Sequence, residues 1–245
     1  MTKTFLAVYK REFLSYFRTP LAIVFLCVFL VLSGIFTFRL GGFYERGQAD
    51  LQPFFLWHPW LYLFIAPAIS MRLWAEERKS GTVELLCTLP ISTFEATAGK
   101  FFAAWSFLAL TLLLTFPIVI TVLVLGSPDV GVILAGYLGS LLMAGAFLSL
   151  GLCVSAATDN QVISFVVSAA VGLVLVLLGF DPVLDTLRDI FPPVVVEELA
   201  NFSFPYHFEA IQRGVVDLRD VIYFVLLIVF GLVGSTIVLD RAKAS

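Results

Sequence analysis

Six long apolar stretches, separated by shorter polar segments, dominate the pattern of this 245-residue chain. A helix rises about 1.5 Å per residue, so about 20 apolar residues are enough to cross a bilayer. The predicted spans are Leu21–Phe38, Phe54–Met71, Phe101–Leu125, Val132–Ala157, Val162–Phe180 and Val221–Leu239. Composition agrees, because 60% of the residues are hydrophobic and only 13% are charged. We therefore expect an all-α polytopic membrane protein with one transmembrane domain over residues 1–245.

An even number of spans places both termini on the same side of the membrane, and basic residues indicate which side this is. The side shared by the termini carries Lys3, Lys10, Arg11, Arg18, Arg72, Arg78, Lys79, Lys100, Arg241 and Lys243. The other five of the 15 basic residues lie on the opposite side. Because Lys and Arg are enriched in cytoplasmic loops, both termini are predicted to be cytoplasmic.

Residues 1–20 are expected to form an interfacial helix ahead of the first span. Its apolar side would carry Phe5, Leu6, Tyr9, Phe13, Tyr16 and Phe17, and its basic side Lys3, Lys10, Arg11 and Arg18. This pattern is typical of a helix that lies in the headgroup layer. A flexible tail is the alternative that the pattern leaves open.

The predicted cytoplasmic segment 72–100 is the longest on its side and the richest in charges of both signs. Its central run is Glu76-Glu77-Arg78-Lys79-Ser80-Gly81-Thr82-Val83-Glu84-Leu85-Leu86. Gly81 is expected to end the helix that continues from the second span. Thr82 can then cap a short helix that has Glu84 in its first turn and Leu85 and Leu86 on an apolar patch.

A second helix start is predicted within the same segment at Ser92-Thr93-Phe94-Glu95, which has the spacing of a capping box. The short amphipathic helix would thus be held between two rigid connections. This shape suits docking into a groove on a soluble partner, whereas a solvated hairpin is the alternative.

The predicted external segment 181–220 alternates carboxylates with apolar runs, which favours short helices at the outer interface. Its candidate gate or partner-binding residues are Glu197, Glu198, Tyr206, His207 and Phe208. A stable interfacial cap is an equally good interpretation of the same residues.

Several chemistries have no supporting motif. The chain lacks the G-x-x-x-x-G-K-[ST] phosphate loop, so we expect any ATP hydrolysis to occur on another protein. The predicted spans contain no charged residue, which counts against an ion-coupled carrier. We expect no catalytic residue and no metal site. His58, next to Trp57 and Trp60, is interpreted as a residue of the outer aromatic belt.

Small residues recur every four positions along the fourth predicted span, and such faces let helices approach closely in lipid. They are Ala135, Gly136, Gly139, Ser140, Ala144, Gly145 and Ser149. The pattern fits either a packing seam within the chain or an interface with another subunit.

The run E-E-R-K-x-G-T-x-E-L-L-x-x-L-P after the second span resembles the coupling segment of ABC type 2 transporter permeases. Two further stretches agree, namely Thr158-Asp159-Asn160-Gln161 and Tyr206-His207-Phe208 followed by Gly214–Asp220. The resemblance covers nearly the whole chain. It is closest to the branch that includes the gliding-motility-associated permease and the permease for nitrous oxide reductase maturation.

The resemblance implies a non-catalytic permease subunit of a bacterial inner membrane, paired with an identical or related permease and driven by ATP-binding subunits. ATP and Mg would be bound by those partners, and this chain would hold no cofactor of its own. Residues that would contact the ATPase are Glu76, Glu77, Arg78, Gly81, Thr82, Glu84, Leu85 and Leu86.

Such permeases usually export lipids, polysaccharides, peptides or drugs. The resemblance leaves one alternative of a different class open, which is a mechanotransmission anchor that relays ATPase motion to a periplasmic protein. No nucleic-acid partner is expected.

Overall fold

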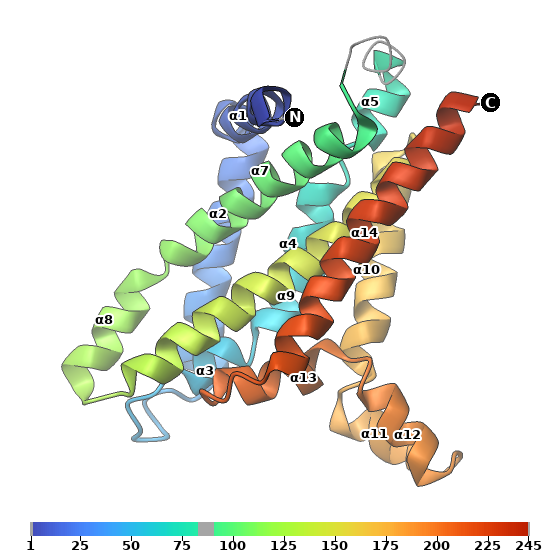
Figure 1. Ribbon diagram of the computed structural model, residues 1–245. Coiled ribbons are helices and arrows are strands. Elements are labelled where there is room, and N and C mark those ends of the chain that lie inside the picture. The colour runs from blue at the N-terminus through green and yellow to red at the C-terminus, as the bar shows by residue number, and fades with distance from the viewer. Residues whose placement is uncertain (1, 83–90, 245) are drawn as a thin grey trace.

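In the computed structural model, which describes residues 2–82 and 91–244, long helices run from one end of the molecule to the other (Figure 1). Both termini lie at one end, together with α1 (Thr2–Arg18) and α5 (Ala75–Lys79). The opposite end carries α3 (Gln52–Phe55) and three short helices. These are α11 (Asp181–Arg188), α12 (Pro193–Ala200) and α13 (Phe204–Gln212). We call the two ends the terminal end and the distal end.

The long helices are formed by the apolar stretches of the sequence. They are α2 (Pro20–Ile35) with the π-helix η1 (Phe36–Leu40), α4 (His58–Ser70), α7 (Thr93–Leu113) with α8 (Phe116–Leu125), α9 (Val130–Ala157), α10 (Gln161–Leu177) and α14 (Leu218–Ala244). Among the described residues, all regular secondary structure is helical. The prediction of an all-α polytopic membrane protein is therefore confirmed at this level.

The number of spans depends on how α10 and α11 are counted. Five helical stretches are long and apolar enough to cross a membrane: Pro20–Leu40, Gln52–Lys79, Thr93–Leu125, Val130–Ala157 and Leu218–Arg241. A sixth is present if α10 and α11, which meet at a 70° bend, form one broken span. The bend lies just before Pro182, in the first turn of α11, because proline is tolerated at a helix start but cannot continue a preceding helix. The predicted span Val162–Phe180 thus corresponds to a helix that ends at Leu177.

Helix α9 lies at the centre of the fold and contacts α4, α7, α10, α13 and α14. Its small residues are used within the chain. A Cβ added at Gly136 would lie 2.3 Å from the Phe55 ring, and one at Gly139 would lie 2.5 Å from Ile211. A Cβ added at Gly231 of α14 would likewise lie only 2.5 Å from the backbone of Ser149. The small-residue face is therefore a packing seam inside this chain.

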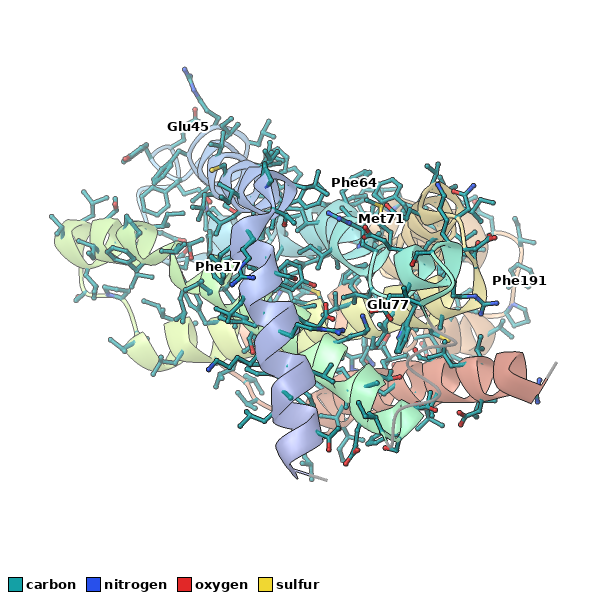
Figure 2. The ribbon with its side chains drawn as sticks, turned by 90° about the horizontal axis from the view of Figure 1, so that it is seen from above. Phe17, Glu45, Phe64, Met71, Glu77 and Phe191 are labelled. Carbon is teal, nitrogen blue, oxygen red and sulfur yellow. The ribbon has the colours of Figure 1, made fainter. Side chains whose placement is uncertain are left out.

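The N-terminal helix α1 crosses the terminal end of the molecule and packs along α7 (Figure 2). Tyr16 stacks on Phe107 with ring centroids 4.9 Å apart, and the Tyr9 hydroxyl donates to Ser106 at 3.1 Å. Residues 2–18 are helical as predicted, and their position in the headgroup layer stays a prediction. Its predicted apolar side is divided, because Leu6 remains 59% exposed while other members of that side contact α7.

His58 does not belong to an exposed aromatic belt, so this interpretation was wrong. Its side chain is fully buried at the start of α4, with the Phe54 ring centroid 4.4 Å from its own. Phe29 of α2 lies against the histidine as well, at 5.9 Å. The short helix α3 turns the chain so that neighbouring rings enclose His58, which a window of local sequence does not reveal.

Candidate coupling site

The described part of the segment predicted to contact an ATPase lies at the terminal end, where α9 holds its first residues in place. The hydroxyl oxygen of Ser155 accepts hydrogen bonds from the backbone amides of Trp74 and Ala75, both at 3.1 Å. The same hydroxyl donates to the carbonyl of Met71 at 3.1 Å. These bonds satisfy backbone groups where the chain leaves α4 and enters α5. The start of α5 is thereby fixed to the central helix.

A second attachment of α5 comes from Arg78, one of the predicted coupling residues. Its guanidinium donates to the carbonyl oxygen of Ala156, near the C-terminal end of α9. A cation is favourable there because the last carbonyls of a helix are unpaired and carry partial negative charge. Glu76, on the opposite side of the short helix, is exposed and pairs with Arg72 at 3.0 Å.

Lys100 is the centre of a buried charge cluster that joins three helices. Its side chain on α7 is only 2% exposed, and Nζ lies 2.8 Å from Glu77 of α5 and 3.3 Å from Glu12 of α1. The ammonium also lies 4.9 Å from the centre of the Trp74 ring, within the range of a cation–π contact. Arg11 completes the cluster, at 2.7 Å from Glu12 and 3.7 Å from Glu77. We call these four charged residues the Lys100 cluster.

Electrostatics within the Lys100 cluster favour the charged forms of Glu12 and Arg11. Burial alone would raise the pKa of Glu12, but the nearby Lys100 ammonium and the hydrogen bond from Arg11 outweigh it and lower the pKa below its ordinary value. The hydrogen bond that Arg11 donates to Glu12 outweighs the opposing effect of burial, so the pKa of the Arg11 guanidinium is raised. Arg11 is 61% exposed, whereas removing Lys100 would leave the largely buried carboxylates of Glu12 and Glu77 without their shared cation, which costs about 3–5 kcal/mol.

Close contact between α1 and α7 brings Glu12 within reach of Lys100. A Cβ added at Gly99 would lie 2.9 Å from Cγ1 of Val8, so only glycine lets the two helices approach this closely. The Gly99-Lys100 pair has no relation to a phosphate loop. Instead, Gly99 leaves room for α1, and Lys100 pairs with the carboxylate of Glu12 on α1.

The turn after α5 agrees with the predicted helix break. Gly81 has φ +70°, a left-handed conformation that other L-residues adopt at a cost. Thr82 is exposed, and its hydroxyl donates to the carbonyl of Glu77 at 3.3 Å. Glu84, Leu85 and Leu86, and with them the predicted short helix, lie outside the described residues.

The far side of the segment is anchored as predicted. Ser92 caps α7, and its hydroxyl oxygen accepts from the amide of Glu95 at 3.1 Å. The hydroxyl of Thr93 donates to Asp240 of α14 at 2.7 Å. Residues 83–90 therefore connect two points that are both fixed to the helices of the membrane domain.

The candidate residues at the distal end separate into two groups. Glu197 and Glu198 are exposed on α12, and Tyr206 is 47% exposed on α13. His207 and Phe208, in contrast, are each 2% exposed and belong to the packed interior of the fold. His207 therefore supports the distal end from inside the fold, whereas Phe208 also lines a cavity there.

His207 fastens α13 to α14. Nδ1 lies 2.7 Å from a carboxylate oxygen of Asp220, and Nε2 lies 2.8 Å from the carbonyl of Asn201. The ring also stacks on Tyr223 at 3.9 Å.

Sequence reasoning missed the role of Asp220, and it likewise missed Lys100 and Glu12. For Asp220 and Lys100, the signal was a charged residue directly before an apolar stretch.

These features define a class: a multi-pass helical membrane protein in which hydrogen bonds attach both described ends of the segment between α4 and α7 to other helices. Over residues 10–179, more than half of the chain, the sequence matches the family described as ABC-2 family transporter protein. The chain belongs to this family. It is therefore a membrane component of an ABC transporter, and membership implies association with ATP-binding-cassette ATPase subunits. No curated protein matches the sequence.

Proposed function

We propose that this chain is the permease subunit of an ATP-driven exporter in a bacterial inner membrane, with both termini in the cytoplasm. It would pair with a second, identical or related permease as a dimer. Separate subunits would bind ATP and Mg and would hydrolyse the nucleotide. Family membership supports the permease role, and the excess of Lys and Arg on the side of the termini supports the orientation.

The ATPase subunits would dock on the segment 72–100, through the short helix that the sequence predicts after Gly81. The observation that carries this proposal is the Lys100 cluster. Glu77 belongs to the coupling segment, whereas Glu12 and Lys100 belong to α1 and α7. A displacement of α5 would therefore move α1 and α7 as well, because separating them exposes uncompensated buried charge. In this arrangement, α1 would act as the connecting helix of the permease.

Co-purification tests the docking step. Replacing Leu85 and Leu86 with Asp places charge on the predicted apolar patch, so the ATPase subunit should no longer co-purify with the permease. Replacing Val194 and Val195 with Asp is the matched control, because these apolar residues are 70% and 41% exposed at the distal end. The control should retain the ATPase subunit. Equal recovery with the Leu85/Leu86 variant would refute docking at this segment.

One observation favours a relay to a periplasmic protein as the second candidate function. Helices α11 and α12 form a small hydrophobic cluster of their own, built from Leu184, Val196 and Ala200. The exposed carboxylates of Glu197 and Glu198 lie on this lobe, and α13 links it to α14 through His207. Such a lobe could carry motion to a partner that has a basic surface.

Charge reversal at Glu197 and Glu198 separates the two functions. If the chain acts as a relay, the variant with Lys at both positions should keep its ATPase subunit and lose its periplasmic partner. If the chain acts as an exporter, the same variant should export substrate at the wild-type rate. The side chains are exposed, so the change should leave the fold intact.

A further inference from the structure

Two adjoining cavities open at the distal half of the molecule. The first, of about 430 Å³, is bordered by residues of α3, α4, α10, α11 and α13; we call it the headgroup cavity. It is lined by Trp57, Trp60, Phe180, Asp181, Glu209 and Gln212, among others. The second, of about 370 Å³, lies between α2, η1 and α4; we call it the chain groove. Its lining includes Val28, Leu32, Phe36, Leu61, Phe64 and Ile65.

Trp57 and Trp60 line both cavities, so the two cavities lie side by side. The chain groove is apolar and opens at the surface of the helices, where Phe64 is 59% exposed at their outer edge (Figure 2). The headgroup cavity, in contrast, has carboxylate and amide groups along its wall. The combined site is thus amphipathic, with its polar part at the distal end and its apolar part along the predicted spans.

Two buried polar atoms on the wall of the headgroup cavity have no hydrogen-bond partner among the residues that the structure describes. The Gln212 side chain is 8% exposed, and its Oε1, a hydrogen-bond acceptor, is unpaired. Nε1 of Trp57, a donor, is likewise buried and unpaired. Buried polar groups are nearly always hydrogen-bonded, so this pair indicates a ligand that supplies one donor and one acceptor.

The surrounding charges and rings favour a cation as the donor. Asp181 and Glu209 line the cavity with carboxylates, and Arg213 pairs with Glu209. Trp60 and Phe180 lie edge to face with centroids 5.9 Å apart. Carboxylates and aromatic faces together are the groups that recognise an ammonium ion. A primary ammonium, unlike a quaternary one, can also donate to Gln212.

We propose that the headgroup cavity and the chain groove bind a membrane lipid whose zwitterionic headgroup joins a primary ammonium to a phosphate. The ammonium faces Asp181 and donates to Gln212, and a phosphate oxygen accepts from Trp57. One acyl chain lies in the chain groove. This binding requires neither ATP nor an ATPase subunit, so it goes beyond the proposed function and is tested independently of it.

The test uses the purified full chain and a single-chain phosphoethanolamine lipid that carries a photoreactive diazirine on its acyl chain. After irradiation, mass spectrometry should locate the label on the chain groove, at residues such as Phe36, Leu61 and Phe64. An unlabelled ethanolamine lipid should compete with the probe about tenfold better than a glycerol-headgroup lipid of the same chain length, as expected for a hydrogen bond to a charged group.

Variants connect the labelling to the headgroup cavity. Gln212→Leu and Asp181→Asn should each lower the affinity for the ethanolamine lipid about tenfold. Trp57→Phe should lower this affinity by a similar factor, although it keeps an aromatic ring in place. Asp189→Asn is the matched control, since Asp189 is exposed on the same side and lines neither cavity. Equal competition by the two lipids, or labelling spread evenly over the lipid-facing helices, would overturn the proposal. Loss of labelling on formation of a permease dimer would also overturn it, because a second copy would then occupy the groove.

Discussion

Replacing Lys100 with Met tests whether the Lys100 cluster holds three helices together. Methionine keeps most of the length of the side chain and removes its charge. Lys100 Nζ is 2.8 Å from Glu77 and 3.3 Å from Glu12, and the two carboxylates are only 20% and 16% exposed. Removing one partner from such a buried set costs about 3–5 kcal/mol. Arg11 remains 2.7 Å from Glu12 and partly compensates, so we expect about 3 kcal/mol.

Unfolding of the purified protein in mixed micelles with increasing denaturing detergent measures this loss directly. A companion variant with Glu12→Gln, Glu77→Gln and Lys100→Met carries no uncompensated carboxylate, and its stability should return to within about 1 kcal/mol of the wild type. Lys79→Met is the control for loss of a nearby exposed charge, with an expected effect within about 0.5 kcal/mol. If Lys100→Met were as stable as Lys79→Met, the cluster would not hold the helices together.

Three further predictions concern single residues at the terminal end. Gly99→Ala should destabilise the protein by about 1–3 kcal/mol in the same unfolding assay because α1 must move away, whereas Gly34→Ala, which meets nothing within 4 Å, should be nearly neutral. Gly81→Ala and Gly47→Ala both introduce a side chain at positive φ in open space and should each cost about 1–2 kcal/mol, but only the Gly81 variant should weaken ATPase co-purification. The lowered pKa of Glu12 contributes stability that is fully present above its ordinary value of 4.5 and is lost as pH falls through the folded-state value. The stability difference between wild type and Glu12→Gln should therefore shrink below about pH 4.5, and an unchanged difference at pH 3.5 would contradict the assigned shift.

Features that depend on a few neighbouring residues were predictable from the sequence. The apolar stretches gave the long helices, because their length and composition leave few other structures in a membrane. The cap at Ser92 and the break at Gly81 followed from local backbone chemistry, and both are found where they were expected. The helix over residues 1–20 was predictable for the same reason.

Features that depend on contacts between distant residues were not predictable. Glu12 and Lys100 are 88 positions apart and meet only because α1 crosses α7 at Gly99. His207 and Asp220 pair across the turn between α13 and α14, and neither residue forms a recognisable motif with the other. The small residues of α9 left two interpretations open until their neighbours, such as Phe55 and Ile211, were known.

The central claim, that the segment after α5 contacts the ATPase subunit at the terminal end, is tested most directly by site-specific photocrosslinking in intact membranes. A photoreactive residue at Thr82, exposed beside the segment, should form an adduct with the ATPase subunit. The same residue at Gln48, exposed at the distal end, should form none. An ATPase adduct from position 48, or none from position 82 while the complex still co-purifies, would contradict the account.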